Sequence, residues 1–459
     1  MRNLRKNEFI KWGLISSLFT LVVILLLYQI NINISILVIA LFFIYYLKIL
    51  RKKQEPSYLS LVFLFVLALT SLFWQRKLEL SPYLSGIIAL GLLVNILFND
   101  LEFSFAYLFF INILGTLIFD SDFRLFLIYL VASSTAIFLS RGVRKRFDVI
   151  KAGFLAGVVE FLMIISVNFL FQVSELIQSL KLSLINGLVS SVLVLGLLPI
   201  FEYLLGVVTN ISLLELSDFN HPLLRRMILE APGTYQHSLI VANLAESAAE
   251  AIGANSILTR VGAYYHDIGK ISKPEYFSEN QMLARYKDRH RNLTPAMSKL
   301  IIMNHVKEGV ELAKKYHLNR KIIDFITQHH GTTLVYYFFR RAQDKKPQEG
   351  SSEEVYRYPG PKPQSKEVAI VHLADTVEAT SRTLEDSSPS RIKEMVREAI
   401  LSKFLDGQLD ETELTLKDLE KIGEVFTRVL NAMFHTRIDY PKPSDENSSK
   451  KPSKNSQNK

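Results

Sequence analysis

The sequence predicts an all-α protein in two parts, a polytopic helical membrane domain over residues 1–207 and an all-helical domain over residues 233–440. Three observations predict this class. The chain of 459 residues is 49% hydrophobic, and its apolar runs are concentrated in the first 207 residues. All ten histidines lie at or after His221. From Thr234 onward the apolar residues recur with the helical period, and no stretch shows the alternation of a half-buried strand.

Eight apolar runs account for the first part. They cover residues 12–30, 33–50, 58–74, 83–98, 101–119, 124–140, 150–172 and 183–207. Each is near the ~20 residues that a helix needs to cross the hydrocarbon core of a bilayer. Basic residues gather before the first run and in the loops 51–53 and 141–146, so the positive-inside rule puts the N-terminus inside. The loop with Arg76 and Lys77 is an exception to this rule, because this topology puts its two basic residues outside. We therefore predict a multi-pass protein of the cell membrane whose second part is cytoplasmic.

Few ionisable residues lie within these runs. Glu160 is in the middle of one run, and Glu202 is near the end of the last. A carboxyl group inside a membrane marks a functional site or a hydrogen bond between two helices, and both alternatives remain open for Glu160. The scarcity of such charges argues against a transporter.

A linker over residues 208–232 joins the two parts, and a short amphipathic helix within it ends before Pro222. In the second part we expect helices over residues 234–252, 256–266, 295–316, 321–330, 366–383 and 389–436. An insert over residues 338–365 separates the helices 321–330 and 366–383, and its stretch 356–363 is predicted to be a rigid, proline-rich loop. The charged segment 282–292 is predicted to be a solvated loop, with a His290 that faces the substrate as the alternative. Residues 441–459 are rich in Ser, Asn, Lys and Pro, and this composition predicts a disordered tail.

Composition also limits the chemistry. The chain has no cysteine, so a metal must bind to nitrogen and oxygen ligands. The net charge of +9 is weak support for a nucleic-acid polymer as partner, because cytoplasmic loops of membrane proteins collect Lys and Arg.

A set of histidines and aspartates on apolar helix faces predicts a metal site. One such histidine is usually a hydrogen-bonded core residue, but five histidines and two aspartates on five segments are hard to explain as independent choices. The set comprises His237, His266, Asp267, His305, His329, His330 and Asp375. Its size suits two divalent cations, which together stabilise the attacking and leaving oxygens of a displacement at phosphorus. Asp267 is the best candidate to bridge them, because a carboxylate has two oxygens.

Several motifs resemble a known family. The pair His266-Asp267, with His237 before it and Asp375 after it, resembles the HD-domain metal-dependent phosphohydrolases. Longer stretches resemble the seven-transmembrane HD family of the PgpH type. They read Ala-Pro-Gly-Thr-Tyr-Gln-His-Ser at 231–238, Tyr-Tyr-His-Asp-Ile-Gly-Lys at 264–270, His-His-Gly-Thr at 329–332 and Tyr-Pro-Gly-Pro-Lys-Pro at 358–363.

The resemblance implies a phosphodiesterase that opens cyclic di-AMP to the linear dinucleotide pApA at a di-iron or di-manganese site in an HD-type domain. It assigns one metal to His237, His266, Asp267 and Asp375, and the other to Asp267, His305, His329 and His330. Asp267 and Lys270 are the candidate catalytic residues. Lys270 contacts a phosphate of the substrate or forms a salt bridge to a ligand carboxylate, and both alternatives remain open. Thr332, Arg340 and Arg382 are candidate substrate contacts.

Members of this family usually carry a large extracellular domain after the first span. Here only residues near Asn31 and Ile32 separate the first two runs, so we expect that domain to be absent. The alternatives are the same chemistry on another nucleotide such as cyclic di-GMP, and a membrane receptor whose HD domain only binds nucleotide. The expected partners are the cyclic dinucleotide and the lipid bilayer, and a homodimer is left open.

Overall fold

Helices make up most of the chain that the computed structural model describes, which comprises residues 58–119, 122–171, 176–284, 289–345, 352–386 and 388–434. No β-strand occurs in these ranges, where residues pair only at an isolated bridge between Leu334 and Arg357. The predicted all-α class is confirmed. The first two predicted spans, over 12–30 and 33–50, and the predicted tail over 441–459 lie outside the described residues.

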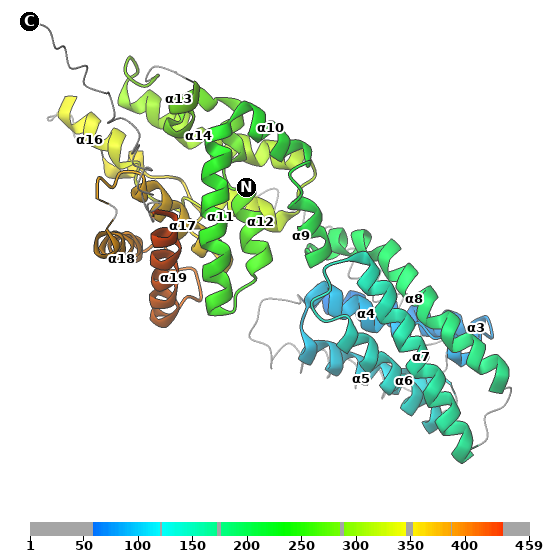
Figure 1. The fold of residues 1–459 in the computed structure, drawn as a ribbon. Helices are drawn as coiled ribbons and strands as arrows, with labels where there is room; N and C mark the ends of the chain where they lie inside the picture. Colours follow the sequence, from blue (N-terminus) through cyan, green and yellow to red (C-terminus); the bar gives the residue numbers. More distant parts are fainter. Residues whose placement is uncertain are drawn as a thin grey trace, which may run out of the picture.

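The first part of the described chain is a bundle of six apolar helices (Figure 1). They are α3 (Tyr58–Lys77), α4 (Ile87–Phe98), α5 (Leu101–Ile118), α6 (Phe123–Leu139), α7 (Arg146–Phe171) and α8 (Leu176–Leu205), with the 3-10 turn η1 (Pro82–Leu84) before α4. The helices α3, α5, α7 and α8 are long and apolar enough to cross a membrane, whereas α4 and α6 are shorter. Helices therefore occur at each of the last six predicted spans.

The helices α7 and α8 approach each other closely. A Cβ atom at Gly187 would overlap the main chain of Gly153 and lie 2.8 Å from Cα of Gly157, so only glycine fits there. Further along the same pair, Asn186 Nδ2 donates a hydrogen bond of 3.0 Å to Glu160 Oε2. Of the two alternatives for Glu160, the structure therefore contains the hydrogen bond between helices.

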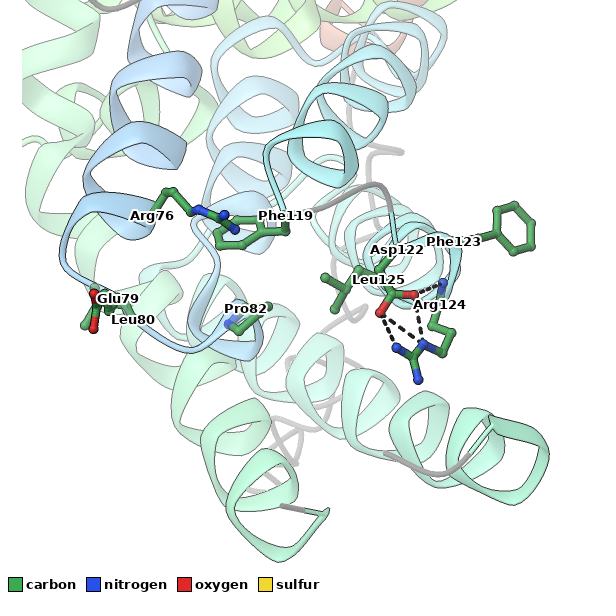
Figure 2. A pocket seen from close by; sticks show the side chains of 9 residues that line it. All are labelled: Arg76, Glu79, Leu80, Pro82, Phe119, Asp122, Phe123, Arg124 and Leu125. Atoms are coloured by element: carbon green, nitrogen blue, oxygen red, sulfur yellow. Dashed lines mark hydrogen bonds and ion pairs between the residues drawn. The ribbon is translucent and has the colours of Figure 1, made fainter. Parts of the chain in front are cut away.

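A pocket opens at the end of the bundle where α5 leads to α6 (Figure 2). Its lining residues are Arg76, Glu79, Leu80, Pro82, Phe119, Asp122, Phe123, Arg124 and Leu125. Arg124 Nε donates to both carboxylate oxygens of Asp122, at 2.8 and 3.0 Å. This end is opposite the one that leads to the second part, because the other end of α6 leads to Arg146, which pairs with Glu215 of the linker.

The linker contains two short helices, α9 (Asn210–Leu216) and α10 (Pro222–Glu230). The turn from α8 into α9 is held by Glu202, whose Oε1 accepts from the Thr209 amide and whose Oε2 accepts from Ser212 Oγ, both at 2.7 Å. A buried carboxylate that accepts two hydrogen bonds fixes the direction in which the chain leaves the bundle.

Two hydrogen bonds connect this turn to the second part. The Tyr265 hydroxyl donates to the Leu216 carbonyl at 2.8 Å, and Asn319 Nδ2 donates to the Val207 carbonyl at 2.9 Å. Because Tyr265 directly precedes His266, the linker contacts the helix that leads into the His266-Asp267 pair.

The second part is built around α11 (Pro232–Ile252), which packs against α12 (Ser256–Tyr265), α17 (Lys366–Ser381) and α19 (Leu416–Phe434) (Figure 1). Their buried apolar residues form one core with α18 (Pro389–Leu405). The remaining elements are η2 (Ile268–Ser272), η3 (Pro274–Tyr276), α13 (Ser278–Ala284), α14 (Pro295–Lys315), α15 (Arg320–Gln328), α16 (Tyr336–Lys345) and η4 (Glu353–Tyr356).

The insert 338–365 begins with a helix that the sequence did not predict, because α16 continues through residue 345. Phe338 and Ala342, four residues apart, are buried on one side of this helix. They pack with Tyr356 in a small apolar cluster. This pattern is too short to stand out beside the proline-rich stretch that follows it.

Candidate metal centre

The pair His266-Asp267 lies where α12 ends and η2 begins. His266 is the C-cap of α12, and Asp267 is the N-cap of η2. The fully buried side chains of Tyr265 and Ile268 flank the pair and fix it in the core. A Cβ atom at Gly269 would overlap the carbonyl oxygen of His305, so glycine allows η2 to approach α14 closely.

The structure brings all seven predicted ligands to one place. They come from five segments: His237 from α11, the pair from the α12–η2 junction, His305 from α14, His329 and His330 from the end of α15, and Asp375 from α17. Five of them are at most 5% exposed. The side chains of His330 and Asp375 are 23% and 14% exposed, so solvent reaches the cluster from their side.

The two carboxylate oxygens of Asp267 face different histidines. Oδ2 lies 3.3 Å from His266 Nε2 and 3.6 Å from His237 Nε2. Oδ1 lies 3.3 Å from His305 Nε2 and 3.5 Å from His329 Nε2. The carboxylate therefore lies between two pairs of imidazole nitrogens.

Two compact groups of potential ligand atoms share Asp267. One contains His237 and His266, and the other contains His305, His329 and His330. Asp375 lies beside both groups, with Oδ1 3.1 Å from His237 Nε2 and Oδ2 3.7 Å from His330 Nδ1.

Main-chain carbonyls orient three of the imidazoles. His266, His305 and His329 each direct Nδ1 to the carbonyl oxygen three residues earlier, at 2.7, 2.6 and 3.0 Å. If Nδ1 carries the proton in each ring, Nε2 is left as a lone-pair donor toward Asp267, the arrangement that metal-binding histidines require.

Several buried polar atoms of the cluster lack a hydrogen-bond partner among the described residues. They are Nε2 of His237, Nε2 of His266 and Oδ1 of Asp267. Leaving such atoms unpaired in the interior costs free energy. A divalent cation would satisfy all three, because neutral imidazole and ionised carboxylate are suitable ligands for it. The residues present therefore fit a metal.

Glu378, which is not among the predicted site residues, supports the His237 ring on the side away from Asp267. Its Oε2 accepts a 2.6 Å hydrogen bond from His237 Nδ1, and the side chain is buried. Arg382 pairs with the other oxygen of Glu378, at 2.5 Å. Glu378 follows Asp375 by three residues on α17, so helical spacing puts both carboxylates on one face. This spacing is the only signal in the sequence that could have indicated the residue.

Lys270 pairs with Asp267 and Glu279. Its Nζ lies 2.7 Å from Asp267 Oδ2 and 2.9 Å from Glu279 Oε1. Burial alone would raise the pKa of Asp267, but the Lys270 ammonium and the His266 imidazole hold it well below its usual range. Of the two alternatives for Lys270, the structure contains the salt bridge to a ligand carboxylate.

The buried histidines differ in how readily they take up a proton. Burial lowers the pKa of His305 to about 4 and lowers the pKa of His330 well below its usual value. Burial also opposes protonation of His237, but the carboxylates of Asp375 and Glu378 beside the ring raise its pKa to about 10. His305 and His330 are thus neutral at pH 7, as a metal ligand must be.

The predicted substrate contacts are distributed around the site. The Thr332 amide donates to Gln408 Oε1 at 2.8 Å, and Gln408 Nε2 donates to the Thr332 hydroxyl at 2.9 Å. Arg340 is positioned on α16, where its Nε donates to the Tyr336 hydroxyl of the same helix. Arg382 reaches the cluster through Glu378, as described above.

His290 is buried, so the prediction of a solvated loop is wrong at this residue. It is 7% exposed, its Nε2 donates to the Tyr276 carbonyl at 2.8 Å, and its ring lies against Phe338 of α16. Arg289 and Arg291 on either side are exposed. Because its neighbours are charged, the sequence did not indicate that His290 is buried.

Tyr358 packs against His330. The two rings are stacked with centroids 4.3 Å apart and planes 28° from parallel. The Tyr358 amide donates to the Thr333 carbonyl at 3.0 Å, which ties the motif at 358–363 to the segment after the His329-His330 pair. Burial raises the pKa of the Tyr358 phenol, so it remains a neutral hydroxyl beside the cluster.

Comparison with known families gives two matches that together cover most of the chain. Residues 26–209 match the family described as a 7TM receptor with intracellular HD hydrolase. Residues 234–380 match the HD domain. The first match corresponds to the apolar helices, and the second begins at Thr234 and includes all seven clustered residues.

Two curated relatives are similar over nearly the whole chain. The cyclic-di-AMP phosphodiesterase PgpH of Bacillus subtilis is 36% identical over 395 residues, which are 84% of this chain and 55% of the relative. The protein of that name in Listeria monocytogenes is 35% identical over 420 residues, 88% of this chain and 58% of the relative. The chain thus spans somewhat more than half the length of these relatives.

A solved structure is also similar to the second part. It is the HD domain of the L. monocytogenes phosphodiesterase PgpH in complex with cyclic di-AMP. It matches 48% of this chain and 100% of its own length, with 46% sequence identity and a TM-score of 0.45.

Proposed function

Because the chain belongs to the family of 7TM receptors with an intracellular HD hydrolase, we propose that it is a membrane-anchored, metal-dependent phosphodiesterase that hydrolyses cyclic di-AMP to pApA. The observation that carries this proposal is the position of Asp267, whose two oxygens each face a separate pair of imidazole nitrogens at 3.3 to 3.6 Å.

His237, His266, Asp267 and Asp375 would hold one cation, and Asp267, His305, His329 and His330 the other. When bound, two divalent cations supply Lewis acidity toward a phosphodiester. The all-nitrogen and oxygen ligand set is compatible with iron or manganese. The orphaned buried atoms of His237, His266 and Asp267 support this assignment.

The other polar residues of the site would position these ligands. Lys270 holds Asp267 ionised and links it to Glu279, so we assign it a positioning role beside its predicted catalytic one. Glu378 accepts from His237 Nδ1 and so directs Nε2 toward Asp267. Partners of this kind orient metal-binding imidazoles and strengthen them as ligands.

The choice of substrate rests on the two relatives named as cyclic-di-AMP phosphodiesterases. The opening beside His330 and Asp375 is the side from which a nucleotide would reach the cluster. Thr332 lies two residues after His330, and we keep it as a substrate contact made through its main chain or hydroxyl. For Arg382 the contact with Glu378 favours a supporting role, and Arg340 remains a candidate contact at the periphery.

The membrane half would anchor the enzyme in the cell membrane with residues 1–207 as the transmembrane domain and the HD domain, residues 233–440, in the cytoplasm. The four long apolar helices support the anchoring. The orientation rests on the basic loops alone. The linker would pass changes in the bundle to the site, because Tyr265, next to His266, bonds to the Leu216 carbonyl.

The test is hydrolysis by the purified full chain in detergent micelles. Cyclic di-AMP and cyclic di-GMP are each incubated with protein loaded with Mn²⁺ or Fe²⁺, and the products are separated by chromatography. We expect pApA from cyclic di-AMP, and its loss with EDTA. Turnover of cyclic di-GMP alone would overturn the substrate. A metal-loaded protein that hydrolyses neither nucleotide would overturn the enzymatic proposal in favour of a nucleotide-binding receptor.

A further inference from the structure

The end of α18 is bound tightly to the segment that follows the His329-His330 pair. The Arg357 guanidinium forms a bidentate salt bridge with the Asp406 carboxylate, with N–O distances of 2.7 and 3.0 Å. It also donates a hydrogen bond of 2.9 Å to the Thr332 carbonyl. Gln408 exchanges hydrogen bonds with the amide and hydroxyl of Thr332. These contacts fix the last turn of α18 beside the metal ligands.

Lys403 lies in that last turn and faces the same segment. Its Nζ donates a weak hydrogen bond of 3.3 Å to the hydroxyl of Thr333. The side chain is half-buried. Burial lowers the pKa of Lys403, and the carboxylate of Asp375 is the largest influence that opposes this effect. The ammonium is therefore within electrostatic reach of a candidate metal ligand at the open side of the cluster.

Three other cations near the site each have a carboxylate partner. Lys270 pairs with Asp267 and Glu279, Arg357 with Asp406, and Arg382 with Glu378. Within the described ranges, no carboxylate oxygen lies within 4.0 Å of Lys403 Nζ. Asp406, three residues away, is already engaged by Arg357.

A half-buried ammonium without a counter-ion is costly unless an anion reaches it. A cyclic dinucleotide has two phosphodiesters, and only one of them can be the reacting group at the metal pair. The other needs a separate positive charge. Lys403 has the charge and the donors for a phosphate oxygen.

We propose that Lys403 binds the phosphate of the dinucleotide that is not being hydrolysed, with Thr333 holding its ammonium in place. This inference rests on the proposed function. Lys403 is thus a substrate-binding residue that makes the site selective for substrates with two phosphates. It should affect binding of the dinucleotide more than the chemical step.

The experiment compares two substrates in the metal-loaded full chain. Cyclic di-AMP has two phosphodiesters, and bis(p-nitrophenyl) phosphate has one. In the variant Lys403→Met we expect KM for cyclic di-AMP to rise about tenfold or more, the usual effect of losing a hydrogen bond to a charged group, with kcat changed less than threefold. Hydrolysis of bis(p-nitrophenyl) phosphate should be unchanged, which also demonstrates an intact metal site.

A second readout does not depend on turnover. Calorimetric titration of EDTA-treated protein with cyclic di-AMP should give about tenfold weaker binding for Lys403→Met than for the wild type. Lys403→Arg, which keeps the charge, should recover part of the affinity. The matched control is Lys393→Met, at an exposed position of the same helix, and it should behave as the wild type.

The outcomes separate this inference from the proposed function. Lys403→Met with unchanged KM and affinity, or with equal losses on both substrates, would overturn the role of Lys403. A wild type that cleaves only cyclic di-GMP would overturn the proposed substrate. The KM of the wild type and of Lys403→Met would then be compared on cyclic di-GMP, and the same rise of about tenfold in KM is expected. A wild type that neither binds nor cleaves a cyclic dinucleotide would overturn both.

Discussion

His237 and Glu378 are joined by a buried hydrogen bond of 2.6 Å, although 141 residues separate them in the sequence. The bond connects α11 to α17, and Asp375 of α17 contacts the other nitrogen of the same ring. The imidazole is thus held between two carboxylates of one helix. One of them is a candidate metal ligand, and the other fixes the orientation of the ring.

The first prediction concerns this support. In Glu378→Gln we expect metal affinity to fall about 10- to 100-fold, because the amide is a weaker acceptor for Nδ1–H and leaves the imidazole less basic. Metal content after dialysis against graded free Mn²⁺ measures the effect. Glu385→Gln, at an exposed position just beyond the same helix, should retain wild-type affinity. Equal affinities in the two variants would contradict the role of Glu378.

The second prediction concerns the bridging position. Asp267→Asn removes the charge from the carboxylate that both groups of ligands share, so we expect the protein to lose both metals and turnover of cyclic di-AMP together. Elemental analysis and the hydrolysis assay measure the two effects. Asp344→Asn on the exposed part of α16 is the control. Full activity in Asp267→Asn, or loss of one metal with the other retained, would refute the bridging role.

The third prediction concerns close packing at the site. In Gly269→Ala the added methyl group would collide with the carbonyl oxygen of His305, and we expect a loss of about 3 kcal/mol in stability. Thermal unfolding of EDTA-treated protein measures it. In Gly423→Ala the new Cβ would meet only Ile400 Cδ1 at 3.4 Å, so that variant should be neutral or slightly stabilised. A Gly269→Ala protein as stable as Gly423→Ala would show that η2 can move away from α14.

The all-α class and most helix positions could be predicted because the apolar period and the Gly and Pro signals are local properties of the chain. The convergence of the seven candidate ligands could be predicted as well, because the apolar period puts them on the buried sides of five helical segments. Their role in binding metal stays a prediction. Glu378 could not be found in this way, because a glutamate three residues after an aspartate is common on helices. Only the fold of α17 against α11 brings it to His237.

The unpredicted helix α16 explains the error at His290. No helix is predicted within the insert 338–365, so nothing in the sequence indicates what buries His290. In the structure the Phe338 ring of α16 lies 5.0 Å from the His290 ring, measured between centroids. The Arg341 side chain of the same helix donates to the His290 carbonyl at 3.0 Å. The burial of His290 depends on α16, which is distant in the sequence. The charged residues around His290 therefore do not indicate that it is buried.

The last prediction concerns pH and uses His372, a buried residue behind the cluster. Its Nδ1 donates to the His329 carbonyl, and its Nε2 has no hydrogen-bond partner among the described residues. Burial lowers the pKa of His372 from 6.5 to about 4. As pH falls, the unfolded chain therefore takes up the proton first. The stabilising contribution is complete above about pH 6.5 and is lost progressively toward pH 4, with a total on the order of 3 kcal/mol.

The variant His372→Asn keeps a donor for the His329 carbonyl but does not titrate in this range. We therefore expect its thermal midpoint, measured with EDTA, to fall less between pH 6.5 and 4.5 than that of the wild type. Part of the fall should remain, because burial also lowers the pKa of His305 to about 4. His317→Asn is the matched control, since His317 is exposed and its φ of 54° suits asparagine. If His372→Asn and His317→Asn lost the same stability over this range, His372 would not be a group whose protonation destabilises the fold.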